Sequence, residues 1–289
     1  MRYRDFRSEP DRHGHVILSE AKDLSWSKGM SSRAKDLTAG DEKILRFAQN
    51  DNKQLGEAFM VSAILLAGGS GHRMNSDTAK QYLEVGGIPL IVHALRAFEE
   101  SEADSVVLVV REGDESYVRS EILDRYGIRK VTAVVPGGKE RFDSVWEGLR
   151  AVGSAADDIV LIHDGARPFV SPEMIHASID AARRYGACTV AVPVKDTIKV
   201  VDGEGFGIDT PDRSTLYQVQ TPQSFRLSLI LEAHRRFRED PRPGITDDTM
   251  LVEEYLGQKC YMVQGGYENL KVTTPEDIIL AEALLARLR

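Results

Sequence analysis

One stretch constrains the fold of this chain more than any other: an apolar run over residues 61–67 that stops abruptly at the glycine-rich segment 68–71. The run is typical of a buried strand, and the glycines are typical of a turn at its carboxyl end. Two fixed cations, Arg73 and Lys80, follow the turn. In open α/β sheets, ligands bind at the carboxyl ends of strands, and glycine turns let backbone N–H groups approach an anion. The stretch therefore predicts a loop that binds the phosphates of a nucleotide.

Apolar and amphipathic segments alternate regularly after Met60. We expect strands at residues 61–67, 105–110, 131–135, 158–162 and 189–194. We expect helices at 89–100, 114–126 and 140–152, and another that begins with Ser171 as N-cap and Pro172 at its first position. Several strand–helix pairs in series, with strands apolar on both faces, predict an α/β fold in which helices cover both faces of a mainly parallel sheet.

A polar, glycine-rich segment interrupts this alternation at about residues 195–217. Strand patterns at 195–201 and 214–219 flank a connection rich in glycine and aspartate, which predicts a hairpin-like β-arm protruding from the sheet. Because the segment is too polar for a core, we expect a flap or an arm toward a second subunit. The regular pattern then resumes with expected helices at 226–238 and 246–256, a strand at 260–264 and a last helix that opens at Thr274-Pro275.

Residues 1–59 differ from the rest of the chain. They carry a crude internal repeat, 19–24 against 32–37, and show no sustained helical or strand period. We interpret them as a misassigned upstream start, with Met60 as the start of the folded protein; the alternative is a disordered extension. The folded domain is expected to span residues 60–289.

Composition excludes several classes of protein. The 289 residues carry a formal net charge of −8, whereas general nucleic-acid binders carry a basic face. No apolar run reaches the ~18 residues of a membrane span, and no signal-peptide pattern opens the chain. The two cysteines, Cys188 and Cys260, lack the spacing of metal ligands. We therefore expect a cytoplasmic protein with no nucleic-acid or membrane partner.

The glycine loop matches neither of two common phosphate-binding motifs. The P-loop pattern is absent because Glu140 follows Gly138-Lys139, and Gly69-x-Gly71-x-x-Met74 leaves the dinucleotide fingerprint incomplete. Polar clusters instead end three predicted strands, at 68–80, 137–144 and 163–167. In a parallel sheet these loops converge on one edge, which is the geometry that a nucleotide site requires.

Several spaced motifs carry a family resemblance. Segment 67–74 followed by Lys80-Gln81-Tyr82 resembles the N-terminal signature of sugar-nucleotide-type nucleotidyltransferases. Later motifs are similar to those of the 2-C-methyl-D-erythritol 4-phosphate cytidylyltransferase family: 163–168, 193–199, 221–223, 246–248 and 269–273. The resemblance covers residues 60–289 and none of 1–59. It implies a Rossmann-like nucleotidyltransferase fold and transfer of CMP from CTP to 2-C-methyl-D-erythritol 4-phosphate, with release of pyrophosphate, in non-mevalonate isoprenoid biosynthesis.

The resemblance also implies which residues hold the nucleotide. Arg73 and Lys80 match the catalytic cations that stabilise charge on the α-phosphate and on the departing pyrophosphate. Asp164 matches the carboxylate that helps to position Mg²⁺, the expected cofactor. The implied nucleotide-binding positions are Ala67, Gly68, Gly69, Ser70, Gly71, Gly138 and Ser144.

A second set of residues is implied for the sugar phosphate. Arg213 and Lys271 match residues that orient it, and Arg167 and Thr197 match others that line its pocket. In the family, the β-arm that contains Thr197 and Arg213 reaches the partner subunit. The resemblance therefore implies a homodimer with shared sites that acts on CTP and a sugar-alcohol phosphate.

The chain departs modestly from the family pattern. His72 stands where a second arginine is common, and Lys139 stands where an acidic residue can occur. We interpret Asp247-Asp248 as acids at a helix N-terminus, favoured by the helix dipole, rather than as a metal pair.

Two other functions stay open at this point. A ribitol-5-phosphate cytidylyltransferase would share the fold and the nucleotide loop, and a non-catalytic nucleotide-binding module would need only part of the site. Segments 166–168 and 269–273 favour the methylerythritol phosphate over ribitol phosphate. The joint presence of Arg73, Lys80 and Asp164 with the sugar-phosphate cations favours an enzyme, because binding alone does not require this full set.

Overall fold

A computed structural model describes residues 60–69, 80–153 and 158–288 of the chain. All of them fall in one compact unit, Phe59–Arg289. The interpretation of residues 1–59 as an extension or an upstream start lies outside the described residues.

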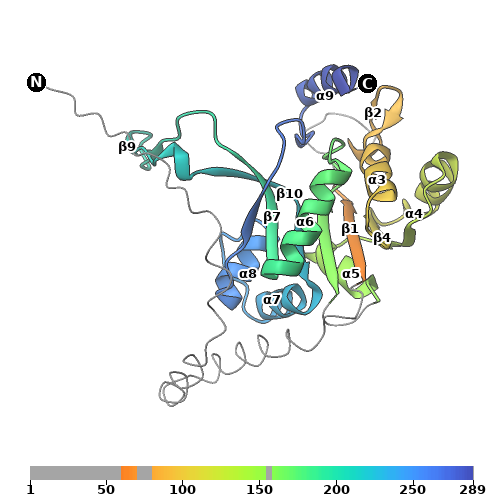
Figure 1. Ribbon diagram of the computed structural model, residues 1–289, viewed down its shortest axis with the longest axis horizontal. Coiled ribbons are helices and arrows are strands. Elements are labelled where there is room, and N and C mark those ends of the chain that lie inside the picture. The colour runs from red at the N-terminus through yellow and green to blue at the C-terminus, as the bar shows by residue number, and fades with distance from the viewer. Residues whose placement is uncertain (1–59, 70–79, 154–157, 289) are drawn as a thin grey trace, which may run out of the picture. The chain divides into compact units, whose positions relative to one another are not determined.

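Seven strands of the described chain form a central sheet (Figure 1). Their spatial order is β11 (Tyr261–Gln264), β7 (Ala187–Pro193), β10 (Tyr217–Arg226), β6 (Ile159–Asp164), β1 (Val61–Ala67), β4 (Ser105–Val110) and β5 (Val131–Pro136). The pairs β1–β4, β1–β6, β4–β5 and β7–β11 are parallel, whereas β10 runs antiparallel between β6 and β7. The predicted mainly parallel α/β sheet is confirmed.

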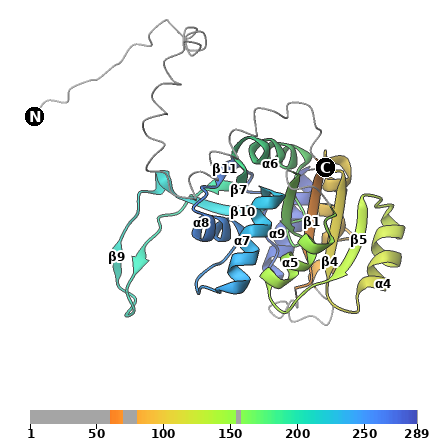
Figure 2. The same ribbon diagram turned by 90° about the horizontal axis from the view of Figure 1, so that it is seen from below.

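Helices cover both faces of this sheet, and Figure 2 shows α6 on one side with α5 and α7 on the other. One core lies under α3 (Leu90–Glu100), the π-helix η3 (Val118–Asp124), which follows the short α4 (Glu115–Tyr117), and α6 (Pro172–Tyr185). The opposite core lies under α5 (Arg141–Ala151), α7 (Leu227–Glu239) and α8 (Asp248–Leu256). In β1, Ala63 and Leu65 enter the first core and Ile64 the second, as the period of two along a strand requires.

Local sequence explains where the helices begin and end. The Ser171 side chain caps α6 by accepting a hydrogen bond from the backbone of Met174, Pro172 follows at the first position, and Gly186 ends the helix with φ of 82°. The predicted start of this helix is confirmed. The last helix, α9 (Pro275–Leu288), packs a third apolar cluster near the short strands β2 (Glu84–Val85) and β3 (Ile88–Pro89).

The β-arm is present, but it is built differently from the prediction. Its hairpin pairs β8 (Val200–Val201) with β9 (Gly207–Asp209), and Figures 1 and 2 show it projecting from the central sheet. The second predicted arm strand, 214–219, instead passes through the short helix η4 (Arg213–Thr215) into β10. The predicted strand covers only the first residues of β10, because the central residues are buried but polar, including Gln220, Thr221 and Gln223, so no apolar run marks the rest of the strand.

No helix in the described parts of the chain is long and apolar enough to cross a membrane.

Candidate active site

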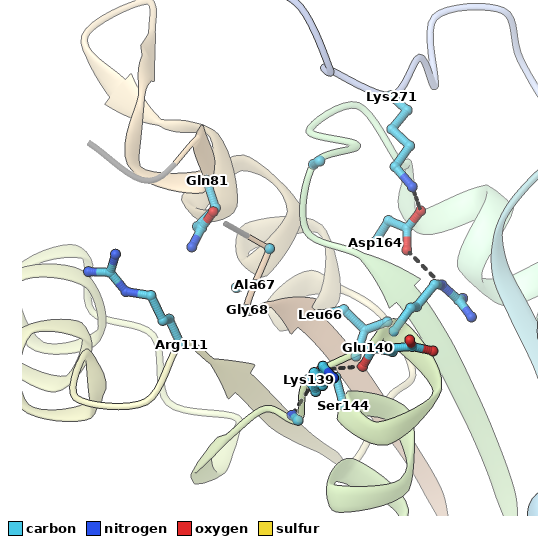
Figure 3. Close-up of a pocket in the computed structure, with 14 residues that line it drawn as sticks. Leu66, Ala67, Gly68, Gln81, Arg111, Lys139, Glu140, Ser144, Asp164 and Lys271 are labelled. Atoms are coloured by element: carbon cyan, nitrogen blue, oxygen red, sulfur yellow. Dashed lines mark hydrogen bonds and ion pairs between the residues drawn. The ribbon is translucent and has the colours of Figure 1, made fainter. Parts of the chain in front are cut away.

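A pocket of about 440 Å³ opens at the carboxyl edge of the sheet, where β1, β4, β5 and β6 end. The chain places β4 and β5 on one side of β1 and then returns to its other side with β6. Such a change of direction leaves a crevice at the ends of the strands, which is the usual ligand position in open α/β sheets. The pocket is lined by Leu66, Ala67, Gly68, Gly69, Gln81, Arg111, Gly138, Lys139, Glu140, Arg141, Ser144, Asp164, Ala166 and Lys271 (Figure 3).

Two glycine turns form one wall of the pocket. Gly68 follows β1, and a Cβ there would lie 3.4 Å from the carbonyl oxygen of Val110. The second turn is tied to the same carbonyl, because the backbone N–H of Gly137 donates to it over 2.7 Å. The two turns therefore lie side by side at the ends of neighbouring strands, where their backbones are accessible to a ligand.

Ser144 holds the second turn in shape. Its Oγ accepts a hydrogen bond from the Gly138 backbone N–H over 3.1 Å and donates to the Glu140 carbonyl over 3.2 Å. Glu140 also closes a capping box with Asp143 at the start of α5. The predicted nucleotide residues Gly138 and Ser144 thus form one fixed structural unit at the pocket.

Asp164 is the central charge of the opposite wall. Its Oδ2 lies 2.7 Å from Nζ of Lys271, and its Oδ1 lies 3.6 Å from Nε of Arg141 (Figure 3). Burial would raise the pKa of this carboxyl, but the charges of Arg141 and Lys271 outweigh burial and hold the pKa well below its usual range. Asp164 is therefore ionised at neutral pH and faces the pocket between two cations.

A short hydrogen-bond chain orients the turn that carries Asp164. The Asp164 backbone N–H donates to Thr221 Oγ1 over 3.1 Å, and Thr221 Oγ1 lies 3.0 Å from His163 Nδ1. The other ring nitrogen, Nε2, lies 3.2 Å from the Arg167 carbonyl oxygen, so it carries the proton and donates. Burial lowers the pKa of His163 to about 4, which keeps the ring neutral and this pattern intact.

The segment that supplies Lys271 is fastened to the same turn. Nη1 of Arg167 donates to the Asn269 carbonyl over 2.7 Å, and the Val272 backbone N–H donates to the Ala166 carbonyl over 2.8 Å. Asn269 is itself buried and donates to Gln220 and to the Thr221 carbonyl. Residues far apart in the sequence are thereby fixed on either side of Asp164.

The structure brings part of the predicted site together. Ala67, Gly68, Gly69, Gly138, Ser144, Asp164 and Lys271 all line the pocket. Arg167 contacts the Lys271 segment but is not one of the lining residues, while Thr197 and Arg213 lie exposed in the arm, where Arg213 donates to the Lys195 carbonyl. Lys80 begins the short helix η2 (Lys80–Tyr82); its side chain, along with Ser70, Gly71, His72 and Arg73, lies outside the described part of the structure.

Sequence reasoning gave no site role to four polar residues that line the pocket: Gln81, Arg111, Glu140 and Arg141. The amide of Gln81 is buried and has no hydrogen-bond partner among the described residues. Arg141 was detectable in principle. It occupies the first turn of α5, where a cation opposes the helix dipole, and such a residue needs an anionic partner.

The acidic pair at residues 247 and 248 divides into two roles. Asp247 caps α8 by accepting from the Met250 backbone, which confirms the helix N-terminal interpretation for this residue. Asp248 lies in the first turn of the same helix, also as interpreted, and in addition forms an ion pair with Arg141. Among the described residues, no group of three or more His, Cys, Asp or Glu side chains could hold a metal ion.

Glycine turns, pocket-facing cations and an ionised carboxylate at the carboxyl edge of such a sheet define a Rossmann-like nucleotidyltransferase. The family model for 2-C-methyl-D-erythritol 4-phosphate cytidylyltransferase matches residues 61–287, and the chain belongs to this family. It is 50% identical over 226 residues to the enzyme of that name from Pelotomaculum thermopropionicum, covering 78% of this chain and 94% of the relative.

Solved structures agree with this assignment. The crystal structure of 4-diphosphocytidyl-2C-methyl-D-erythritol synthase from Anaerococcus prevotii superposes with a TM-score of 0.70 at 35% identity, covering 80% of this chain and all of that one. The 2-C-methyl-D-erythritol 4-phosphate cytidylyltransferase from Thermus thermophilus gives a TM-score of 0.63 at 33% identity, covering 79% of this chain and all of that one.

Proposed function

We propose that this chain transfers CMP from CTP to 2-C-methyl-D-erythritol 4-phosphate, giving 4-diphosphocytidyl-2-C-methyl-D-erythritol and pyrophosphate, in non-mevalonate isoprenoid biosynthesis. The observation that carries the proposal is the convergence, in a member of this family, of both glycine turns with Asp164 and Lys271 in one pocket.

In this reaction a phosphate oxygen of the sugar phosphate attacks the α-phosphorus of CTP, and the bond from that phosphorus to the β-phosphate bridging oxygen breaks. The leaving group is pyrophosphate, which carries away the electron pair of that bond. Both reactants are anions, so positioning and cationic stabilisation lower the barrier without a protein nucleophile. Lys271 and Arg141 supply positive charge at the described pocket, and Arg73 and Lys80 are the cations proposed for the transition state.

The glycine turns suit the nucleotide half of the pocket. The backbone at Gly68 and Gly69 has no Cβ to keep a phosphate chain at a distance, and the Gly138–Ser144 turn offers backbone polar groups and a hydroxyl to a base and ribose. Lys271 stands beside Asp164 on the other wall, where an incoming sugar phosphate would meet its charge.

The residues present fit a single Mg²⁺ ion, which we propose as the cofactor. Asp164 lines the pocket and is ionised, and its Oδ1 is less tightly paired than its Oδ2, at 3.6 Å from Arg141 against 2.7 Å from Lys271. Mg²⁺ is commonly held by one or two carboxylates together with substrate phosphates and water, so Asp164 would be its protein ligand. When bound, the ion would supply charge neutralisation at the triphosphate.

We also propose a homodimer in which the arm of one subunit completes the site of the other. Two observations support it: Thr197 and Arg213 do not line the pocket of their own chain, and Val201, Phe206 and Ile208 are exposed on the arm. A cytoplasmic location belongs to the same proposal, and the two free cysteines suit a reducing compartment.

Pyrophosphate release tests the reaction directly. The purified chain is supplied with CTP and Mg²⁺ and offered 2-C-methyl-D-erythritol 4-phosphate or ribitol 5-phosphate in parallel. We expect release with the first compound. Release with ribitol phosphate alone would establish the alternative enzyme, and CTP binding without release in either reaction would establish a non-catalytic module.

A further inference from the structure

Arg141 is a pocket cation that contacts two carboxylates, those of Asp164 and Asp248. Its Nε faces Asp164 in the pocket, while its Nη1 lies 2.7 Å from Oδ2 of Asp248 on the side away from the pocket. Burial alone would lower the pKa of this guanidinium, but the charges of Asp248 and Asp164 outweigh burial and raise it. Arg141 is therefore a permanent cation held between two carboxylates, one at the pocket and one in the core.

Asp248 is completely buried at the first turn of α8. Its backbone N–H donates to Oε1 of Gln223 over 3.1 Å, and Nε2 of the same amide donates to Asp247 over 2.8 Å. The helix start is thus fixed to β10, and the Asp248 carboxylate has little freedom to move. Such a carboxylate fixes both the place and the orientation of the arginine that it contacts.

His234 holds the other oxygen of that carboxylate. Its Nε2 lies 3.0 Å from Asp248 Oδ1, and its side chain is 1% exposed. The ring packs against Phe142 and Trp146, one turn apart on α5, with centroid separations of 6.2 Å and 6.3 Å. Its Nδ1 has no hydrogen-bond partner among the described residues, so Nε2 carries the proton and donates to Asp248. The carboxylate is therefore held from two directions.

We propose that Asp248 and His234 are positioning residues for the nucleotide site, which fix the Arg141 guanidinium against Asp164 so that it contacts bound CTP. The proposal rests on the proposed function for the identity of the nucleotide. His234 lies on α7, Asp248 at the start of α8 and Arg141 in the first turn of α5. Of these three residues, only Arg141 lines the pocket. Neither Asp248 nor His234 touches substrate, so their effect on activity passes through Arg141.

Steady-state kinetics and calorimetric titration with CTP and Mg²⁺ test this proposal. We expect Asp248→Asn to raise the KM and the Kd for CTP roughly 10-fold or more, the effect usual for a residue that orients a charged group. The KM for the sugar phosphate should change less than about 2-fold, because Arg141 lies beside the Gly138–Ser144 turn, which is proposed to bind the nucleotide. A purely structural loss would lower the active fraction and leave both KM values unchanged. The matched control is Glu254→Gln, which removes one negative charge from an exposed position of the same helix and should behave as wild type.

Two further comparisons decide whether the effect passes through Arg141. His234→Gln retains an N–H donor toward Asp248 and should stay within about 3-fold of wild type for CTP, whereas His234→Leu should resemble Asp248→Asn. The double variant Asp248→Asn with Arg141→Met should bind CTP no more weakly than Arg141→Met alone, because the two residues act as one unit. Additive losses in the double variant, or equal behaviour of His234→Gln and His234→Leu, would overturn the proposal.

These outcomes separate the proposal from the proposed function. If the wild-type chain binds CTP but releases no pyrophosphate with either sugar phosphate, the proposed reaction is wrong, and the dissociation constants for CTP still test the role of Asp248. If Asp248→Asn does not fold, the pair of His234 variants carries the test.

Discussion

Lys271 Nζ lies 2.7 Å from Asp164 Oδ2, which joins the end of β6 to the segment between β11 and α9. The lysine side chain is 39% exposed, whereas that of the aspartate is 12% exposed. The lysine end of the pair is solvated, and the buried carboxylate also faces Arg141, so loss of Lys271 would leave Asp164 with one cationic partner. The significance of Lys271 lies in the charge that it places at the pocket.

Removing this lysine charge should therefore affect activity far more than stability. We expect Lys271→Ala to lower kcat/KM about 100-fold or more, the scale of losing one donor to a developing negative charge, with the KM for the sugar phosphate raised. The melting temperature should fall by less than about 4 °C. Pyrophosphate-release kinetics and thermal denaturation measure the two effects.

Lys259→Ala is the control, because Lys259 is also exposed and lies at the opposite end of β11 from the Lys271 segment. Near-normal turnover of Lys271→Ala would remove this residue from the mechanism.

The buried ring of His163 should make stability depend on pH. Its pKa in the folded chain is about 4, against 6.5 for an unperturbed histidine, so the unfolded chain binds the proton more readily. The free energy of unfolding that this group contributes is fully present above pH 6.5 and is lost as the pH falls toward 4. Between pH 7 and pH 5 the loss from this one group should be about 2 kcal/mol.

Urea denaturation at the two pH values measures that loss. The wild-type chain should lose about 2 kcal/mol more than His163→Gln between pH 7 and pH 5, because the variant has no proton to take up at this position. The variant is expected to be less stable at pH 7, since it breaks the contacts with Thr221 and Arg167, and only the difference in slope tests the prediction. Equal losses in both proteins would contradict it.

The sequence predicted the parts of the site that lie at strand ends. Gly68 and Asp164 directly follow or end apolar strands, and Gly138 comes two residues after another, so local pattern and parallel topology together placed them at one edge. The arm and the mainly parallel sheet were also predictable, because both depend on the alternation of apolar and polar segments.

What the sequence could not predict depends on packing between distant elements. β10 carries buried polar residues whose pattern is typical of a loop, and the Arg141–Asp248–His234 contacts require α5, α7 and α8 to meet. No periodicity within one segment encodes such a contact. An aspartate at the start of a helix is explained by the helix dipole alone, so the pattern gave no reason to seek a partner for Asp248.

The second glycine turn should not tolerate a side chain at Gly138. A Cβ there would overlap the Cβ of Asp143 and lie 3.1 Å from the Asp143 backbone carbonyl carbon, so the turn would have to move. Because the Gly138 N–H is hydrogen-bonded to Ser144, a shift of the turn would also disturb the pocket wall that the two glycine turns form. We expect Gly138→Ala to raise the KM for CTP about 10-fold or more. Gly153→Ala is the control, since a Cβ at Gly153 meets no atom of the described residues within 4 Å, and equal KM values for the two variants would refute the prediction.

The arm gives the sharpest test of the shared site. Arg213 is exposed, is held by the Lys195 carbonyl and does not line the pocket of its own chain, whereas Lys271 does line that pocket. If each site takes Lys271 from one subunit and Arg213 from the other, Arg213→Ala and Lys271→Ala should each be nearly inactive. Mixing the two after dissociation should restore about a quarter of the wild-type activity, because half of the re-formed dimers are mixed and each mixed dimer has one intact site. If both residues served one subunit, every site in the mixture would lack one of them and no activity would return. Re-associating each variant with itself gives the baseline for both outcomes.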